Sequence, residues 1–187
     1  MIQDIQASLE ALRSGGMIVY PTDTIWGIGC DATNPEAVQK IYQLKQREET
    51  RSMLVLLHSP GQLAGYVDAV PDIAWQLIEV ADKPLTLIYP GAKNLAHNLI
   101  GSDGTIGIRM VRDDFCIRLL QAFRKPLVST SANLSGTPSP GCFQDIPDAI
   151  LSGADYVVRW RQDDTTPGQP SSIIKIGHGG TFSILRP

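Results

Sequence analysis

Short apolar runs alternate along this chain with segments of helical periodicity, and that alternation most narrows the folds it can adopt. Amphipathic helices are predicted where apolar side chains recur every three or four positions, at residues 2–12, 35–44, 73–78 and 113–123. Strands are predicted at apolar runs bounded by Gly, Pro and polar turns, at residues 17–20, 54–57, 85–89, 105–110, 127–129, 156–160, 172–176 and 182–185. Strands that alternate with helices, and that cluster near the C-terminus, favour an α/β fold with a twisted mixed sheet flanked by helices.

Length and composition indicate one ordinary domain. The chain has 187 residues, of which 43% are apolar and 19% charged, which is enough apolar material to fill a core. We therefore expect a single domain over residues 1–187. Residues 163–170 are polar and contain Pro and Gly, and are expected to form a mobile surface loop instead of a domain linker.

Several classes of protein are disfavoured by the same data. The apolar runs are far shorter than the roughly 20 residues that a membrane span needs, and residues 1–13 lack a basic stretch followed by an apolar core. We therefore expect no membrane association and a cytoplasmic location. The formal net charge of -3 argues against a protein whose main role is to wrap nucleic acid.

The cysteines and histidines show no metal-binding pattern. Cys30, Cys116 and Cys142 are widely separated and form no C-x-x-C pair, and the three histidines are equally scattered. Structural zinc sites need closely spaced ligands. We expect no metal ion held by the protein alone, so that any metal would arrive on a nucleotide.

Residues 20–29 read Tyr-Pro-Thr-Asp-Thr-Ile-Trp-Gly-Ile-Gly, a strand end that breaks into a turn rich in hydroxyls. Hydroxyls and free backbone amides at a strand end suit a polar ligand. The alternative is a turn in which Thr22 and Asp23 hydrogen-bond their own backbone. The segment has neither P-loop nor G-x-G-x-x-G spacing, so it does not identify a ligand by itself.

Groups that suit phosphate occur in two further places. Lys45, Arg47 and Arg51 lie at and beyond the end of the second predicted helix, and ammonium and guanidinium groups both bind phosphates. Helix ends also collect solvated cations without any ligand. Residues 129–133 place four hydrogen-bonding side chains directly after an apolar strand, as either a phosphate or ribose cradle or an ordinary polar loop.

An arginine stands in a predicted strand that is otherwise apolar. Period-two alternation places Thr105, Gly107 and Arg109 on one face of that strand. A buried guanidinium is costly unless an anion pairs with it. That anion is either a ligand or a structural carboxylate, and the sequence leaves both open. Covalent catalysis is not expected, because G-x-S-x-G is absent.

The order of these motifs resembles that of the YrdC/TsaC family of threonylcarbamoyladenylate synthases, over nearly the whole chain. The matching motifs are Lys45-Gln46-Arg47 as K-x-R, Ser131-Ala132-Asn133 as S-x-N, the turn at 20–24, the strand at 105–109, and the terminal Ile-Leu-Arg-Pro. The resemblance implies a YrdC-like fold with a concave basic cleft. It also implies the short form, without the C-terminal domain of longer relatives.

Such a synthase converts L-threonine, bicarbonate or CO2, and ATP into L-threonylcarbamoyl-AMP and pyrophosphate, for the t6A modification at position 37 of tRNA. The resemblance implies ATP as a substrate with Mg²⁺ carried on it, and downstream tRNA threonylcarbamoyl transferase proteins as partners. The residues implied as catalytic are Lys45, Arg47, Ser131 and Asn133. Those implied to bind ATP are Lys45, Arg47, Arg51, Thr105, Ser131, Asn133, Ser139 and Arg186. Those implied to bind threonine are Thr24, Arg109, Ser129 and Ser171.

Two alternatives to this function stay open at the level of the sequence. One is a related carbamoyl or adenylyl transferase, and the other is an RNA-binding or ribosome-maturation module of the same fold with direct contacts to tRNA or other RNA. The acidic net charge and the lack of a basic and aromatic stripe disfavour the second. Lys45 and Arg47 are expected at an exposed helix end, where replacement by Ala should lower turnover and leave the melting temperature nearly unchanged.

Overall fold

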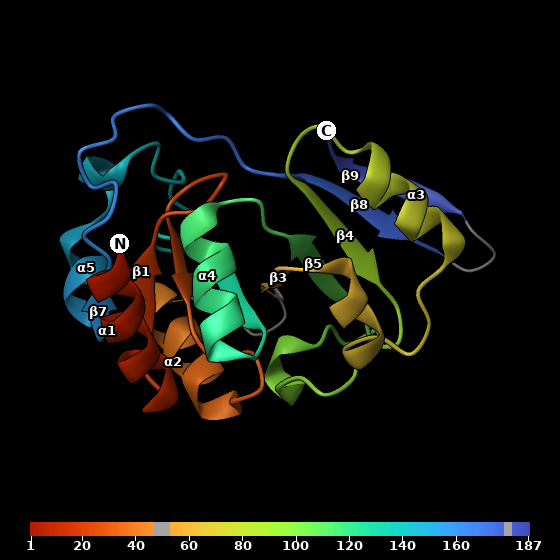
Figure 1. The fold of residues 1–187 in the computed structure, drawn as a ribbon, viewed down its shortest axis with the longest axis horizontal. Helices are drawn as coiled ribbons and strands as arrows, with labels where there is room; N and C mark the ends of the chain where they lie inside the picture. Colours follow the sequence, from red (N-terminus) through yellow and green to blue (C-terminus); the bar gives the residue numbers. More distant parts are fainter. Residues whose placement is uncertain (47–52, 178–180) are drawn as a thin grey trace.

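The structure is a computed structural model that describes residues 1–46, 53–177 and 181–187 (Figure 1). Its helices are α1 (Ile2–Arg13), α2 (Pro35–Lys45), α3 (Asp72–Val80), α4 (Asp114–Phe123) and α5 (Asp148–Gly153), with short 3-10 helices η1 (Pro60–Gly65), η2 (His97–Leu99) and η3 (Phe143–Asp145). Its strands are β1 (Ile18–Tyr20), β2 (Gly27–Gly29), β3 (Leu54–Leu57), β4 (Leu85–Tyr89), β5 (Ile106–Met110), β6 (Leu127–Ser131), β7 (Tyr156–Val157), β8 (Ser172–Ile176) and β9 (Phe182–Arg186). No helix in the described ranges is long and apolar enough to cross a membrane.

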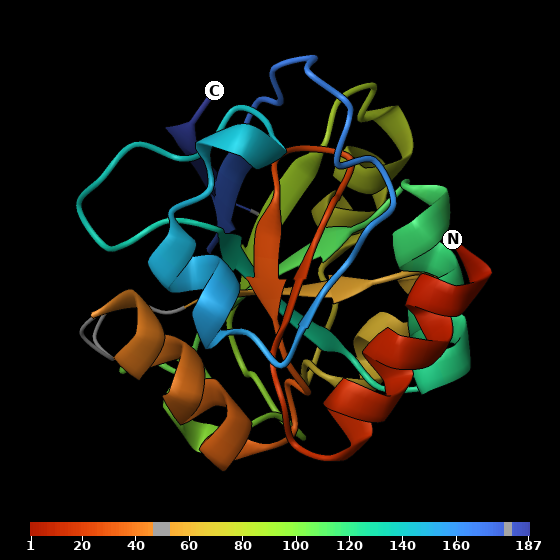
Figure 2. The same cartoon turned by 90° about the vertical axis from the view of Figure 1, so that its left-hand side faces the viewer.

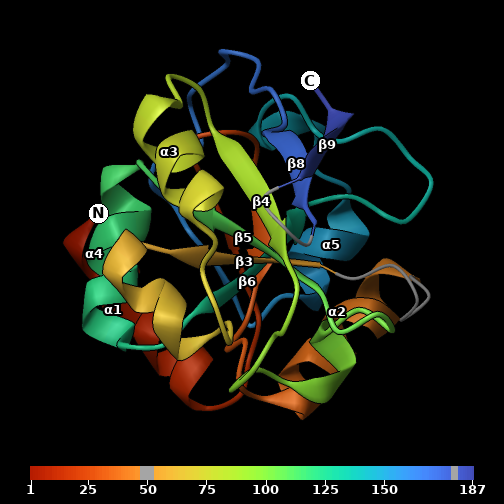
Figure 3. The same ribbon diagram turned by 90° about the vertical axis from the view of Figure 1, so that its right-hand side faces the viewer.

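The strands form one sheet in the order β7-β1-β2-β6-β3-β5-β4-β8-β9. The pairs β1 with β7, β3 with β5, and β4 with β8 are parallel, and the remaining pairs are antiparallel. Because both kinds of pairing occur, the predicted mixed sheet is confirmed. Figures 2 and 3 show the sheet between two layers, with α1 and α4 on one side and α2 and α5 on the other.

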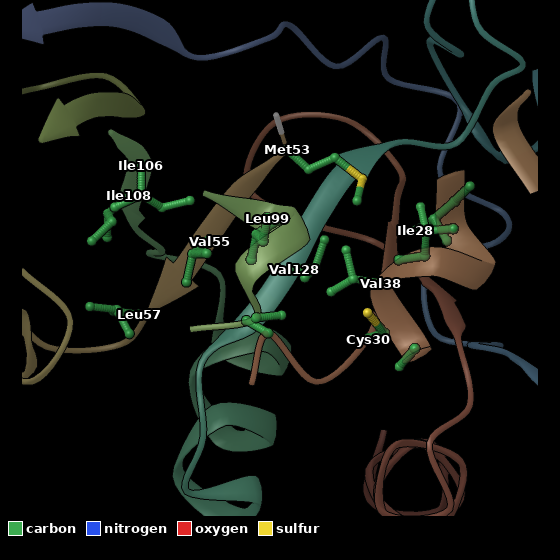
Figure 4. Close-up of a cluster of buried hydrophobic side chains, with 14 of the residues drawn as sticks. Ile28, Cys30, Val38, Met53, Val55, Leu57, Leu99, Ile106, Ile108 and Val128 are labelled. Carbon is green, nitrogen blue, oxygen red and sulfur yellow. The ribbon is translucent and has the colours of Figure 1, made fainter. Parts of the chain in front are cut away.

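Alternate residues of the strands point to two different faces of the sheet. Face A carries the larger core, in which side chains from β2, β3, β5 and β6 meet α2 and η2; Figure 4 shows this cluster around Val55, Ile108 and Val128. Face B carries a smaller core around Tyr20, Leu56 and other side chains, covered by α1 and α4. These two helices cover only the part of face B that lies near β1, β6 and β7, and the rest of face B holds the pocket described below.

Local capping explains where α2 begins and ends. The Asn34 side chain accepts hydrogen bonds from the first backbone amides of α2, and Pro35 occupies its first turn. Gln46 ends α2 in the left-handed conformation, with φ of 51°. This boundary leaves Lys45 as the last helical residue, which decides where its long side chain can reach.

Two observed elements were not predicted, and two predicted strands differ in their bounds from those observed. The sequence prediction missed β2 and α5, placed the end of β6 two residues too early, and extended β7 beyond Val157. Strand β2 reads Gly-Ile-Gly, which looks like a turn. A Cβ on Gly29 would stand 2.4 Å from the Val128 carbonyl oxygen, so this strand needs glycine to lie against its neighbour.

Candidate functional site

The part of face B that α1 and α4 leave open forms the floor of a pocket of about 270 Å³. Its floor and walls are built mainly from small and hydroxyl-bearing residues, two arginines and a few apolar side chains, and no carboxylate lines it in the described ranges. The lining residues are Thr24, Ile25, Gly27, Met53, Leu54, Thr86, Ile88, Thr105, Gly107, Arg109, Ser129, Thr130, Ser131, Ser139, Pro170, Ser171, Ile173 and Arg186. The pocket is therefore suited to polar anions.

Strand register places the two arginines at the ends of one row across the floor. Thr86 of β4 lies opposite Arg109 of β5 and opposite Ile173 of β8, and Ile173 lies opposite Arg186 of β9. Neighbouring strands are about 4.8 Å apart, so the backbones at the two ends are separated by about 14 Å. Two cations that face one such space favour a ligand with negative charge at both ends.

Arg109 is almost fully buried, with 2% of its surface exposed. Its Nη1 donates to Thr24 Oγ1 at 2.7 Å and lies 3.2 Å from Asp23 Oδ1. Its Nε has no hydrogen-bond partner among the described residues. Of the two anions that the sequence left open for Arg109, the structural carboxylate is present as Asp23, and Arg109 also lines the pocket.

The turn after β1 holds itself together and also lines the pocket. Thr22 Oγ1 accepts from the Thr24 amide at 3.0 Å and donates to the Ile25 carbonyl at 2.8 Å. Asp23 Oδ2 accepts from the Arg112 amide at 3.0 Å, which ties the turn to the end of β5. The self-capped turn predicted as an alternative is therefore present, and it fixes Thr24 at the pocket.

Ser171 and Arg186 form the opposite wall. Arg186 Nε donates to the Ser171 carbonyl at 2.7 Å, and its Nη2 lies 3.5 Å from Ser171 Oγ. The Ser171 hydroxyl also contacts Thr86 Oγ1 at 2.8 Å. Partial burial, and then the positive charge of Arg109, lower the pKa of Arg186 from its ordinary value, so an anion between the two guanidinium groups would relieve their repulsion.

The remaining pocket hydroxyls come from β6 and from the loops around it. Ser129, Ser131 and Ser139 all line the pocket, as does Thr105 at the start of β5. Thr105 Oγ1 donates to Asp103 Oδ1 at 2.6 Å. The pKa of Asp103 is lowered to about 2, first by a hydrogen bond from Lys175 and then by the one from Thr105. The Asp103 carboxylate is therefore charged, and it anchors the Thr105 side chain.

The side chains of Lys45 and Asn133 are buried. Lys45 is 1% exposed, and its ammonium donates to the backbone carbonyls of Ser131 and Asn133, each at 2.5 Å. Asn133 Nδ2 donates to the Thr137 carbonyl, and neither side chain is among the described residues that line the pocket. The prediction of an exposed Lys45 was wrong, because the end of β6 offers carbonyl groups within reach of the last turn of α2.

Arg47 and Arg51, both predicted to bind ATP, lie outside the described residues. Of the other predicted site residues, the structure brings eight to the pocket: Thr24, Thr105, Arg109, Ser129, Ser131, Ser139, Ser171 and Arg186.

The segment predicted to be a mobile surface loop at 163–170 is linked to the turn after β1 through Arg161. Asp164 Oδ2 accepts from Arg161 Nη2 at 2.9 Å, and Arg161 Nη1 donates to the Thr22 carbonyl at 3.3 Å. A Cβ on Gly168 would stand 1.9 Å from the Thr24 carbonyl oxygen. The segment is thus packed against the pocket rim, and its continuation places Pro170 and Ser171 in the wall.

The side chains that could bind a metal ion are scattered in the described ranges. Within the described ranges, no group of three or more His, Cys, Asp or Glu side chains could hold a metal ion. The three cysteines are free thiols, and burial raises the pKa of the Cys116 thiol well above its ordinary value. The described pocket residues do not provide the carboxylates that Mg²⁺ prefers, so they do not fit a resident Mg²⁺ site.

Two residues with evident roles at the pocket, Asp23 and Thr86, were absent from the predicted site. The carboxylate of Asp23 pairs with Arg109. The only feature of the sequence that pointed to such a partner was an arginine in an otherwise apolar strand. Thr86 stands in the apolar run Leu-Thr-Leu-Ile-Tyr, where a lone threonine reads as an ordinary β-branched strand residue.

Comparisons with known proteins agree with this geometry. The family model named for Sua5, YciO and YrdC, described as "Telomere recombination", matches residues 10–187. A threonylcarbamoyl-AMP synthase of Pseudoalteromonas translucida is 38% identical over 183 residues, which cover 95% of this chain and 96% of the relative. Another, of Vibrio campbellii, is 33% identical over 175 residues, covering 92% and 94%.

Solved structures share the fold at low sequence identity. P. abyssi Sua5 complexed with L-threonine superposes with a TM-score of 0.87 at 23% identity, over 98% of this chain and 53% of that chain. E. coli YciO superposes with a TM-score of 0.86 at 24% identity, over 100% of this chain and 89% of that chain. With the match of the family model over residues 10–187, these findings show that the chain belongs to the Sua5/YciO/YrdC family.

Proposed function

We propose that this chain is a threonylcarbamoyl-AMP synthase, which forms L-threonylcarbamoyl-AMP and pyrophosphate from L-threonine, bicarbonate and ATP. Relatives that bear this name align over nearly the whole chain. The structural observation that carries the proposal is buried Arg109, which lines a pocket that has many hydroxyl groups and no carboxylate among the described residues. The product would serve tRNA modification through downstream transferase proteins, and we place the reaction in the cytoplasm.

Threonine is proposed to bind at the Arg109 end of the floor. Its carboxylate would pair with Arg109, which Asp23 and Thr24 already hold in place. Charge-assisted hydrogen bonds of this kind are about twice as strong as neutral ones. Ser129 and Ser171, which line the pocket on two sides, would supply further hydrogen bonds to the bound amino acid.

ATP is proposed to bind from the Arg186 side, with contacts to Thr105, Ser131 and Ser139, all of which line the pocket. Arg47 and Arg51 are retained as proposed phosphate contacts. For Lys45 and Asn133 we propose a supporting role: Lys45 holds the backbone at the end of β6, where Ser131 faces the pocket. Lys45 and Asn133 would then affect ATP binding indirectly, by fixing the positions of Ser131 and its neighbours.

The chemistry joins two anions. Bicarbonate supplies CO2 with loss of water, and the threonine amine adds to the CO2 carbon and gives up a proton, which ends in that water; the product is a carbamate. A carbamate oxygen then attacks the α-phosphorus of ATP, and the bond from this phosphorus to the oxygen that bridges to the β-phosphate breaks, releasing pyrophosphate. The approach of a carbamate to a triphosphate costs Coulomb energy, which arginine charges in a partly buried pocket offset more strongly than water does. Holding both substrates on one rigid sheet contributes the orientation.

Mg²⁺ is proposed to arrive on the ATP phosphates, where it would neutralise part of their charge. The described pocket residues supply no carboxylate for it, and we assign none of them to the metal.

The test is pyrophosphate release by the purified protein, with mass spectrometry of the nucleotide product. Release should require ATP, threonine and bicarbonate together, and should yield threonylcarbamoyl-AMP. The variant Arg109→Met should lose most of this activity, whereas Arg118→Met, at an exposed ion pair on α4, serves as the matched control. Release that does not depend on threonine and bicarbonate would refute the proposal.

A further inference from the structure

Thr86 is a buried hydroxyl at the centre of the pocket floor. It is 2% exposed and lines the pocket. Its position in β4 lies between Arg109 of β5 and Ile173 of β8 in the row described above. Among the described residues, the hydrogen-bond partner of its hydroxyl is Ser171 Oγ, at 2.8 Å.

Either hydroxyl can be the donor of this bond. Both residues are nearly fully buried, and whichever hydroxyl donates, the other keeps a proton that needs an acceptor. In one of these two arrangements Thr86 donates and Ser171 Oγ accepts. Arg186, which can only donate, places Nη2 3.5 Å from the same oxygen.

In that arrangement Thr86 and Arg186 both donate to Ser171 Oγ, so the proton of Ser171 points away from both. Ser171 lines the pocket, so the direction left for that proton is toward a bound ligand. A hydroxyl fixed in this way is a hydrogen-bond donor, which suits an anionic oxygen and not an ammonium group.

We infer that Thr86 is a positioning residue that holds the Ser171 hydroxyl as a donor to the carboxylate of the amino-acid substrate. The inference rests on the proposed function, because it takes threonine as that substrate. Thr86 acts on the substrate through Ser171. Its removal should weaken threonine binding and leave the binding of ATP unchanged.

A pair of single substitutions separates the hydroxyl of Thr86 from its methyl group. Thr86→Val keeps the shape and removes the hydroxyl, and should raise the KM for threonine about tenfold, as expected for one lost hydrogen bond to a charged group. Its kcat and its KM for ATP should stay within about twofold of wild type. Thr86→Ser keeps the hydroxyl and should have nearly the wild-type KM for threonine.

A double-mutant cycle shows whether Thr86 acts through Ser171. In a Ser171→Ala background, Thr86→Val should raise the KM for threonine no further. Thr33→Val, which removes a threonine hydroxyl that bonds Asp31 far from the pocket, is the control for general effects. Thermal melting of each variant checks folding, and Thr86→Ala replaces Thr86→Val if the latter does not fold.

Three results would overturn the inference: an unchanged KM for threonine in Thr86→Val, an equal rise in Thr86→Ser, or additive effects in the double mutant. The wild-type protein separates this from the larger proposal. If wild-type pyrophosphate release needs threonine and bicarbonate but Thr86→Val behaves like wild type, the synthase assignment stands and the role of Thr86 falls. If wild type shows no such dependence, the proposed function itself fails.

Discussion

Face B of the sheet has two halves, of which one is covered by helices and the other lines the pocket. Near β1, β6 and β7 the side chains that point to this face include Ile18, Tyr20 and Leu127, and they are buried under α1 and α4. On β4, β5 and β8 the equivalent positions include Thr86 and Arg109, and no helix in the described ranges covers them. The covered half thus carries large apolar side chains on this face, whereas the uncovered half carries hydroxyl groups and an arginine there.

The physical reason is the cost of burying polar groups. A helix that covered Arg109 and the pocket hydroxyls would have to supply a partner for each of them. A polar ligand supplies partners for these groups when it binds, and so it can take the place of a covering helix. The covered half should therefore contribute mainly to stability and the open half mainly to binding, and the following substitutions test that division.

The largest effect is expected in the covered half. Phe115 of α4 is fully buried against face B, and Phe115→Ala should lower the free energy of unfolding by about 3–5 kcal/mol. Urea denaturation measures this. Ile173→Ala in the open half is the counterpart and should cost clearly less, because Ile173 is only partly buried; equal losses would contradict the division.

The next effect belongs to the open half. Arg109→Met should lower kcat/KM for threonine by about a hundredfold, because the substrate carboxylate loses its charged partner. The same variant leaves Asp23 without its cation, so some stability is also lost. Steady-state kinetics at saturating ATP measure the first effect. Arg109→Lys should not restore activity fully, since an ammonium cannot reproduce the guanidinium fork.

Replacement of Lys45 bears on both stability and substrate binding. Because its ammonium holds the carbonyls at the end of β6, Lys45→Met should lower the free energy of unfolding by about 2 kcal/mol. Lys40 of the same helix donates to the Gly15 carbonyl from an exposed position and is the matched control. If Lys45→Met instead lost most of its turnover at an unchanged melting temperature, the result would support the prediction from the sequence that Lys45 is exposed and contacts the substrate.

The smallest effect concerns pH and the exposed edge of the open half. The pKa of Asp103 is lowered to about 2 from 3.8, so its ion pair with Lys175 stabilises the fold above pH about 4, and this contribution is lost as the pH falls toward 2. Both side chains are about half exposed, so it amounts to about 0.5 kcal/mol or less. The stability difference between wild type and Lys175→Gln should shrink from pH 5 to pH 2; a difference that grows would contradict the assignment.

The covered half was also the easier half to predict. The periodicity of residues 2–12 and 113–123 identified α1 and α4, since a helix that packs by one face must repeat its apolar side chains. The alternation of Thr105, Gly107 and Arg109 likewise placed them on one face of β5, and all three line the pocket. Patterns that arise within a single helix or strand can therefore be recognised in the sequence.

What the sequence did not reveal depends on contacts between distant segments. The ion pair of Asp23 with Arg109 joins a turn to a strand far along the chain, and the bonds from Lys45 to β6 span 86 and 88 positions. Strand β2 was hidden because close approach to Val128 demanded glycines, which read locally as a turn. Thr86 was hidden because its partner, Ser171, belongs to a segment read as following a mobile loop.

The most direct test of the central claim is a crystal structure of the protein with L-threonine and a non-hydrolysable ATP analogue. Density for threonine is predicted over β4 and β5, with its carboxylate at Arg109 and the Ser171 hydroxyl, and density for the nucleotide on the Arg186 side. Ligands bound elsewhere on the molecule, with the open half of face B left empty, would contradict the account.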